Sequence, residues 1–241
     1  MAKPAKARKT ASLQHERHYF SLGCRLIVGI DEAGRGPLAG PVVAAAVALP
    51  LERQDLTKAL RGVRDSKEMT AAQREERHDA IKAVASCWGI GQSSAEEIDQ
   101  RGIVAATKAA MQRALDNALS GPNIMPDCLF LDAMLWPERR DIPQASMVEA
   151  DKHSLTVACA SLLAKVWRDR YMIELDAKYG EYGFARHKGY GTAEHLRSLR
   201  RYGPCAAHRR SFKPVYELIG AQDNAASPWR ESGGAPVLSS E

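Results

Sequence analysis

The stretch that decides the fold is Leu26-Ile27-Val28-Gly29-Ile30-Asp31-Glu32-Ala33-Gly34-Arg35-Gly36-Pro37. Its apolar first half predicts a buried strand, and the glycines and proline that follow predict a turn. Two neighbouring acids, Asp31 and Glu32, therefore stand at a strand end, where glycine lets the chain turn so that they need not diverge. Such carboxylates suit a hard divalent cation. On residue type alone, two solvated charges before a turn are the commoner interpretation.

The turn itself combines two glycines with an arginine. Gly34 and Gly36 leave the backbone bare enough for another molecule to approach, and the guanidinium of Arg35 can bind phosphate or ribose oxygens. A second apolar run, residues 42–47, follows after Pro37, Gly40 and Pro41. The two runs predict an antiparallel hairpin.

Composition limits the class of protein. The chain has 241 residues, 45% of them apolar, which is enough to bury the core of one ordinary domain. It contains no apolar stretch long enough to span a membrane, and its N-terminus lacks the apolar centre of a secretory signal. The net charge of +5 favours a polyanionic partner only weakly.

Cysteine usage indicates a reducing compartment. The five cysteines are far apart, odd in number and without Cys-x-x-Cys spacing. This pattern predicts free thiols, argues against a zinc ribbon or a disulfide framework, and favours the cytoplasm. The histidines also lack the spacing of zinc ligands.

Strand and helix patterns alternate along the chain. Residues 1–20 are predicted to be a flexible basic arm, and residues 221–241 a disordered tail. Further strands are expected at 87–93, at 128–131 and around 146–149. Helices are expected after the N-caps Thr70 and Ser94, at 103–119 and at 156–179. A hairpin followed by this alternation predicts an α/β fold with a mixed sheet.

Acids follow three of the predicted strands: Asp31 with Glu32, then Asp132, then Asp151. Because ligands collect at strand ends in open α/β sheets, these side chains could converge in space. Four unneutralised carboxylates would raise one another's pKa values. Two divalent cations about 4 Å apart, bridged by carboxylates and a scissile phosphate, are a known solution for in-line phosphoryl displacement.

The sequence resembles bacterial ribonuclease HII, a type 2 ribonuclease H. The opening stretch, continued to Val42, is similar to the family signature. Further blocks that resemble the family follow in its order: Asp65-Ser66-Lys67, Leu129-Phe130-Leu131-Asp132, residues 160–169, Tyr182-Gly183-Phe184, residues 187–192 and residues 208–212. One block alone would be a weak match, but together they are specific and span roughly residues 26–215.

The resemblance implies a ribonuclease H-like fold, with a mixed five-stranded sheet flanked by helices in residues 21–180. It also implies a small helical substrate-binding extension in residues 181–220. The expected enzyme is an endoribonuclease that cleaves the RNA strand of RNA–DNA hybrids and nicks 5′ to single ribonucleotides embedded in duplex DNA. Two Mg²⁺ or Mn²⁺ ions would serve this hydrolysis, leaving 3′-hydroxyl and 5′-phosphate ends. A monomer is expected.

Site residues are carried over by the same resemblance. Asp31, Glu32, Asp132 and Asp151 are the expected catalytic residues and metal ligands. The backbone of the Gly34–Gly36 turn would contact the ribose 2′-hydroxyl, which only RNA carries, and Tyr190 would stack on the following deoxyribose. The expected substrate-binding residues are Gly34, Arg35, Gly36, Lys67, Lys165, Tyr190, Arg209 and Arg210. For the lysines, the tyrosine and the arginines, a solvated or core position is the ordinary alternative.

The chain also departs from the family pattern. Ala133 and Ala150 stand where glycine is common, and Thr156 stands where serine is usual. None of these changes removes an expected ligand. Two rival functions stay open: a non-catalytic hybrid-binding protein, and a metal-dependent phosphatase or strand transferase. The second rival would ignore the 2′-hydroxyl and act on all-DNA duplexes.

Overall fold

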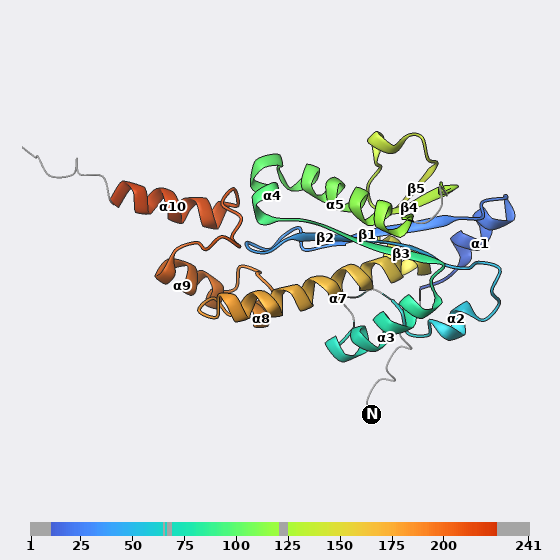
Figure 1. Cartoon of the computed structure of the whole chain (residues 1–241), viewed down its shortest axis with the longest axis horizontal. Coiled ribbons are helices and arrows are strands. Elements are labelled where there is room, and N and C mark those ends of the chain that lie inside the picture. Colours follow the sequence, from blue (N-terminus) through green and yellow to red (C-terminus); the bar gives the residue numbers. More distant parts are fainter. Residues whose placement is uncertain (1–10, 65, 67–68, 121–124, 226–241) are drawn as a thin grey trace, which may run out of the picture.

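A mixed sheet forms the centre of the molecule (Figure 1). The structure is a computed structural model that describes residues 11–64, 66, 69–120 and 125–225. Within these residues five strands pair in the order β3-β2-β1-β4-β5. They are β1 (Ile27–Ala33), β2 (Val42–Ala48), β3 (Cys87–Ser93), β4 (Cys128–Asp132) and β5 (Gln144–Met147). The predicted α/β fold with a mixed sheet is confirmed.

The sheet register brings the first acids together. β1 and β2 form the predicted antiparallel hairpin, whereas β4 pairs with β1 in parallel and places Leu131 opposite Ile30. One residue beyond this pair, Asp31 and Asp132 stand at the same end of neighbouring strands. The last strand, β5, ends at Met147, slightly earlier than expected.

Helices cover both faces of the sheet. In Figure 1, α5 lies on one face and α7 on the other, while α8, α9 and α10 extend beyond one end of the sheet. The described helices are α1 (Gln14–Ser21), α2 (Leu56–Ala59), α3 (Ala71–Val84), α4 (Ala95–Arg101), α5 (Ile103–Ala118), α6 (Ala150–His153), α7 (Leu155–Lys178), α8 (Phe184–His187), α9 (Ala193–Tyr202) and α10 (Lys213–Ala225), with a 3-10 turn at Pro137–Arg139. The capping boxes predicted at Thr70 and Ser94 both form.

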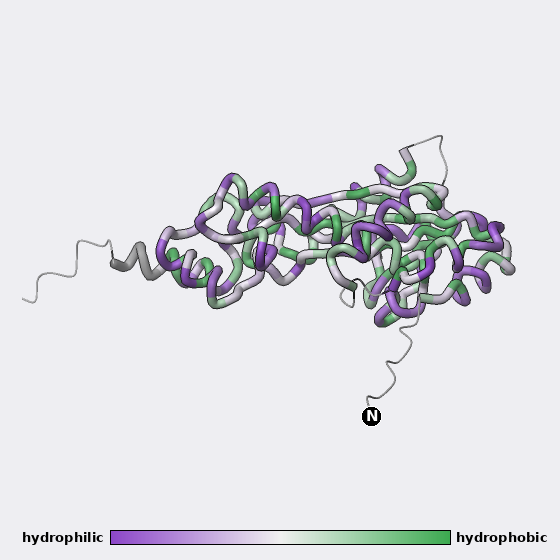
Figure 2. The backbone as a smooth tube through the Cα atoms, turned by 90° about the horizontal axis from the view of Figure 1, so that it is seen from below, coloured by the Kyte–Doolittle hydropathy of each residue, from purple (hydrophilic) through white to green (hydrophobic). Residues whose placement is uncertain are grey.

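Two apolar cores separate the sheet from these helices. Because successive strand residues face opposite sides, Val43 packs in the core beneath α7 and Val42 in the core beneath α5. Strand β2 is therefore apolar on both faces, and so is the first half of β1, where Ile27 and Val28 enter the two cores in the same way. Figure 2 shows hydrophobic and hydrophilic stretches alternating along the backbone, as expected for elements that bury one face. Among the described helices, none is long and apolar enough to cross a membrane.

A glycine sets the distance between β1 and α7. A Cβ atom on Gly29 would lie 2.7 Å from the backbone carbon of Thr156 and 2.7 Å from the backbone nitrogen of Val157. Only glycine permits this approach without a shift of the helix. The start of α7 is thereby held against the strand that carries Asp31.

The prediction of a flexible arm over residues 1–20 is wrong where the structure describes that segment. Helix α1 occupies Gln14–Ser21, and its Glu16 side chain is fully buried. The Glu16 carboxylate accepts hydrogen bonds from Ser154 Oγ (2.7 Å) and from the Thr156 N–H (2.9 Å). A carboxylate at the N-terminus of α7 is favourable. This contact joins residues far apart in sequence, so composition could not indicate it.

Other terminal residues fall partly outside the structure. Residues 1–10 and 226–241 lie outside the described residues. Helix α10 continues to Ala225, so the predicted boundary of the tail at residue 221 is too early.

The prediction of free cysteines is confirmed, since Cys24, Cys87, Cys128, Cys159 and Cys205 are all free thiols.

Replacing Glu16 tests the anchoring of α1. In Glu16→Ala, Ser154 Oγ and the Thr156 N–H lose their acceptor, so the free energy of unfolding should fall by about 2–4 kcal/mol. Glu16→Gln keeps an acceptor oxygen and should lose less. Urea denaturation measures both, with the exposed neighbour His15→Ala as the control. Equal stabilities of Glu16→Ala and His15→Ala would contradict this account.

Candidate active site

A pocket of about 240 Å³ opens where β1 and β4 end. The carboxylates of Asp31, Glu32 and Asp132 line it together with the Gly34–Gly36 turn. The remaining lining residues are Ala33, Ser66, Ser161, Lys165, Arg168 and Tyr190. Segments far apart in the sequence therefore meet at one end of the sheet, as the position of the acids predicted.

Asp31 is the buried centre of this pocket, with 7% of its surface exposed. Its carboxylate accepts a hydrogen bond from the Glu32 N–H (2.8 Å) and another from Ser161. Burial raises the pKa of Asp31 well above its ordinary value, and the charges of Glu32 and Asp132 raise it further. A bound cation would offset this repulsion and favour the ionised carboxylate.

The other acids surround Asp31 unequally. Glu32 forms an ion pair with Arg35 (3.1 Å), and Asp132 accepts a hydrogen bond from the Ala150 N–H (2.9 Å). Asp151 is buried in α6, one residue after Ala150, and does not line the pocket. Three of the four predicted ligands therefore share the pocket, and Asp151 follows the residue whose N–H binds Asp132.

This donor set fits a divalent cation by its chemistry. Carboxylate oxygens are the ligands that Mg²⁺ and Mn²⁺ prefer, and the burial of Asp31 with two further carboxylates leaves negative charge to be neutralised. In the residues that the structure describes, no three acidic, histidine or cysteine side chains are already grouped closely enough to hold a metal ion.

The two alanines at family glycine positions differ in their backbone. Ala133 adopts a left-handed conformation, with φ of 48°, which disfavours residues that carry a Cβ. Ala150 is the first residue of α6, and the left-handed residue there is Glu149, with φ of 54°. A strained backbone therefore flanks Asp132, whereas the Ala150 methyl imposes no comparable strain.

The prediction that Arg209 binds substrate is corrected, because its side chain is fully buried. It donates hydrogen bonds to the carbonyl oxygens of Gly34 (2.6 Å), Arg35 (2.8 Å) and Gly40 (3.0 Å). Burial and the nearby charge of Arg168 lower the pKa of the Arg209 guanidinium. Arg209 holds the main chain that faces the pocket and does not itself reach it.

A second buried guanidinium, Arg168, was not singled out by the sequence. It donates to the carbonyl oxygens of Pro41 (3.0 Å), Ala39 (3.2 Å) and Lys188 (3.0 Å). The side chain also fills the space beside Gly34, whose φ is 91°, because a Cβ there would lie 2.0 Å from Arg168 Nε. Glycine is thus required at position 34. Arg168 and Arg209 therefore both bind main-chain carbonyls of the loop of residues 34–41.

The other predicted substrate contacts have mixed positions. Tyr190 is 48% exposed and lines the pocket. Lys165 also lines it, donates to Asp169 Oδ1 (2.6 Å), and has its pKa lowered by burial. Arg210 is exposed outside the pocket. Lys67 lies outside the described residues.

Two serines were missed as candidates. Ser161 contacts the Asp31 carboxylate and lies 3.2 Å from Ser66 across the two hydroxyl oxygens. Both belong to sequence blocks that resemble the family, but a single serine within such a block carries no separate chemical signal. They connect the loop that holds Ser66 to the central acid.

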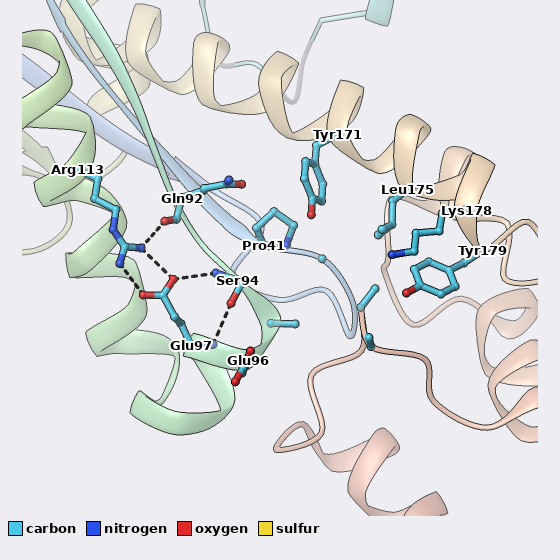
Figure 3. A pocket seen from close by; sticks show the side chains of 14 residues that line it. Pro41, Gln92, Ser94, Glu96, Glu97, Arg113, Tyr171, Leu175, Lys178 and Tyr179 are labelled. Carbon is cyan, nitrogen blue, oxygen red and sulfur yellow. Dashed lines mark hydrogen bonds and ion pairs between the residues drawn. The ribbon is translucent and has the colours of Figure 1, made fainter.

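A larger cavity of about 550 Å³ lies near Gly40 and Pro41 but is lined by none of the predicted site residues that the structure describes. Figure 3 shows its walls, with Tyr171, Leu175 and Lys178 of α7 facing the α4 and α5 side. Arg113 forms an ion pair there with Glu97 (2.6 Å). Arg113 and Glu97 thus already pair with each other, and the described residues that line the cavity include no cluster of carboxylates like that of the acidic pocket, which is the better candidate.

The fold and the acidic pocket together fit a metal-dependent phosphodiester hydrolase. The family model described as ribonuclease HII matches residues 28–215. The chain therefore belongs to the ribonuclease HII family. The ribonuclease HII of Geobacillus kaustophilus is 50% identical over 211 residues, covering 88% of this chain and 77% of that protein. That of Acidovorax sp. is 47% identical, covering 81% of this chain and 89% of that one.

Solved structures share the fold. The ribonuclease H2 of Pyrococcus horikoshii is 26% identical, with a TM-score of 0.64 over 81% of this chain and 98% of that one. The ribonuclease HII of Archaeoglobus fulgidus, solved in complex with PCNA, is 28% identical, with a TM-score of 0.65 over 80% and 96% of the two chains. Family membership makes the chain an endoribonuclease that cleaves the RNA strand of RNA–DNA hybrids, and such enzymes are typically metal-dependent.

Substituting Arg209 tests its role in holding the loop. Arg209→Lys cannot reach three carbonyls at once, so the free energy of unfolding should fall by about 2–4 kcal/mol. Arg210→Lys, an exposed neighbour, is the matched control and should be neutral within about 0.5 kcal/mol. Urea denaturation distinguishes them. A neutral Arg209→Lys would show that the buried guanidinium does not stabilise the loop.

Two buried histidines near Tyr190 predict a pH dependence of stability. Burial lowers the pKa of His195, and it lowers that of His208 to about 4. As the pH falls below about 6.5, these histidines become protonated in the unfolded chain but stay neutral in the folded chain. The free energy of unfolding therefore falls. For His208 alone the loss should be about 2 kcal/mol between pH 7.5 and pH 5. Urea denaturation of the wild type and His208→Gln should show a smaller fall in the variant; equal falls would refute this.

Proposed function

We propose that this ribonuclease also nicks 5′ to single ribonucleotides embedded in duplex DNA, by two-metal hydrolysis that leaves 3′-hydroxyl and 5′-phosphate ends. The observation that supports this most directly is the shared pocket. It places the carboxylates of Asp31, Glu32 and Asp132 beside the bare backbone of the Gly34–Gly36 turn and the exposed ring of Tyr190. Groups suited to phosphate chemistry and groups suited to sugar recognition thus face the same space.

Four acids would hold the cations. Asp31, Glu32 and Asp132 line the pocket, and Asp151 would join them through the α6 backbone that Asp132 already contacts. Bound Mg²⁺ or Mn²⁺ would supply Lewis-acid stabilisation of the charge that develops on the phosphate. The chain's own part is to hold the carboxylates in place, with Ser161 and the Glu32 N–H orienting Asp31.

Sugar recognition would depend on a rigid backbone. The guanidiniums of Arg168 and Arg209 fix the loop of residues 34–41 before substrate arrives, so its peptide groups need not reorganise to meet a ribose 2′-hydroxyl. Tyr190 would stack on the following deoxyribose. Arg35 and Lys165 would contact phosphate, since both border the pocket.

The helical extension would bind the duplex backbone. Its exposed arginines Arg197, Arg200 and Arg201 on α9, with Arg210, present positive charge next to the site. Affinity for nucleic acid should therefore fall steeply with salt. We infer that the protein acts as a monomer in the cytoplasm.

A duplex with one ribonucleotide tests the proposal. The protein should nick it 5′ to the ribonucleotide in Mg²⁺ or Mn²⁺ and fail in EDTA. Asp31→Asn should lower the rate by roughly a thousandfold or more, because it removes a central ligand charge. Asp141→Asn, an exposed acid outside the pocket, is the matched control and should retain full activity.

The rival functions give different outcomes. Binding without turnover in any divalent metal would indicate a hybrid-binding protein. Cleavage of an all-DNA duplex would indicate a phosphodiesterase or strand transferase that ignores the sugar. Cleavage of long hybrids without nicking at a single ribonucleotide would contradict the proposed specificity but leave the family activity intact.

A further inference from the structure

Three buried histidines pack together in the extension and have no part in the chemistry described above. His187, His195 and His208 are 9%, 0% and 2% exposed. The rings of His187 and His195 stack with centroids 4.5 Å apart, and Phe184 packs edge-on against His195. Buried histidines need a hydrogen-bond partner for each ring nitrogen, and those partners determine the tautomers.

The hydrogen bonds form a chain with a fixed direction. The Cys205 N–H donates to His208 Nδ1 (3.0 Å), so the proton of a neutral His208 ring is on Nε2. Nε2 lies 3.0 Å from His195 Nε2 and must donate to it. The His195 proton is therefore on Nδ1, which donates to the Tyr190 carbonyl oxygen (2.9 Å). Both rings are neutral in this chain, which ends on a residue of the active-site pocket.

The turn that carries Tyr190 depends on such support. Lys188 and Gly189 before it both have positive φ, 51° and 81°, and a lysine rarely adopts this conformation. Arg168 donates to the Lys188 carbonyl, and the Leu38 N–H donates to that of Gly189 (2.8 Å). The next carbonyl, that of Tyr190, accepts from His195 Nδ1 and from the Thr192 N–H (2.8 Å). Three successive carbonyls of the turn are thus fixed by groups from elsewhere in the chain.

The other end of the histidine chain contacts the loop of residues 34–41. His208 forms an isolated β-bridge with Ala39, and the N–H of the adjacent Arg209 donates to the Leu38 carbonyl (2.8 Å). The Arg209 side chain holds the Gly34 carbonyl. The adjacent residues His208 and Arg209 therefore connect to both parts of the site. Arg209 binds the loop of residues 34–41, and His208 supports the turn of Tyr190 through His195.

We propose that His195 and His208 are positioning residues of this nuclease. Their hydrogen-bonded pair sets the position of Tyr190 relative to the Gly34–Gly36 turn, and it thereby sets the preference of the enzyme for RNA–DNA junctions. The inference rests on the proposed function, in which Tyr190 contacts the deoxyribose after the ribonucleotide. Neither histidine touches substrate. Each acts through the main chain of Tyr190.

A double-mutant cycle tests this role. The readout is the junction preference, defined as kcat/KM for a duplex with one ribonucleotide divided by kcat/KM for a continuous RNA–DNA hybrid. His195→Leu removes the side-chain donor to the Tyr190 carbonyl and leaves only the Thr192 N–H (2.8 Å), so it should lower this ratio by about fivefold to tenfold, the effect of one hydrogen bond. In a Tyr190→Ala background the same substitution should lower the ratio no further.

Further variants keep the test independent of stability. His195→Asn places an amide N–H near the position of Nδ1 and should restore most of the preference. His78→Leu removes a buried histidine of α3 outside the pocket and should leave the ratio unchanged. Thermal unfolding of every variant is measured in parallel, because general destabilisation would lower both rates and leave their ratio intact.

The outcomes separate the two proposals. An unchanged ratio in His195→Leu, or an equal fall in the Tyr190→Ala background, would overturn the positioning role of the histidines. A fall in His195→Leu with no effect of Tyr190→Ala alone would overturn it as well. Failure of the wild type to nick at a single ribonucleotide would instead overturn the proposed function.

Discussion

Two buried guanidiniums holding main-chain carbonyls are the interaction on which the rest of the site depends. Arg168 and Arg209 together donate to six carbonyl oxygens, five of them in the loop of residues 34–41. Removing charged groups from water is costly unless their hydrogen bonds are satisfied, and here carbonyls satisfy them. The result is a rigid backbone presented without side chains in the way.

The same region concentrates opposite charges. Asp31, Glu32 and Asp132 line the pocket at the ends of β1 and β4, and the buried guanidiniums of Arg168 and Arg209 hold the loop whose Gly34–Gly36 turn also lines it. Burial and neighbouring carboxylates raise the pKa of Asp31, so the acidic cluster by itself is electrostatically unfavourable and a cation would stabilise it. A phosphodiester in this pocket would face both the carboxylates that would hold the cations and the fixed backbone of the Gly34–Gly36 turn.

The sequence predicted the parts that local patterns control. The hairpin, the capping boxes at Thr70 and Ser94, and the positions of Asp31 and Asp132 toward the ends of β1 and β4 follow from periodicity and turn chemistry. Asp151 was expected at a strand end as well, but it lies in α6, after β5 has ended. The sequence-based predictions failed where a contact with a distant part of the chain determines whether a side chain is buried. Glu16 looked like part of a basic arm because its partners on α7 lie far along the chain. Arg209 looked like a surface arginine because burial of a charge depends on carbonyls that no pattern reveals.

The central claim is that distant acids hold paired cations next to a backbone that recognises ribose. The most direct measurement is a crystal structure of the protein with Mn²⁺ and a duplex containing one ribonucleotide, with the ions located by anomalous scattering. The account predicts two manganese peaks ligated by Asp31, Glu32, Asp132 and Asp151, and the 2′-hydroxyl against the Gly34–Gly36 backbone. Manganese elsewhere, or a 2′-hydroxyl facing solvent, would contradict it.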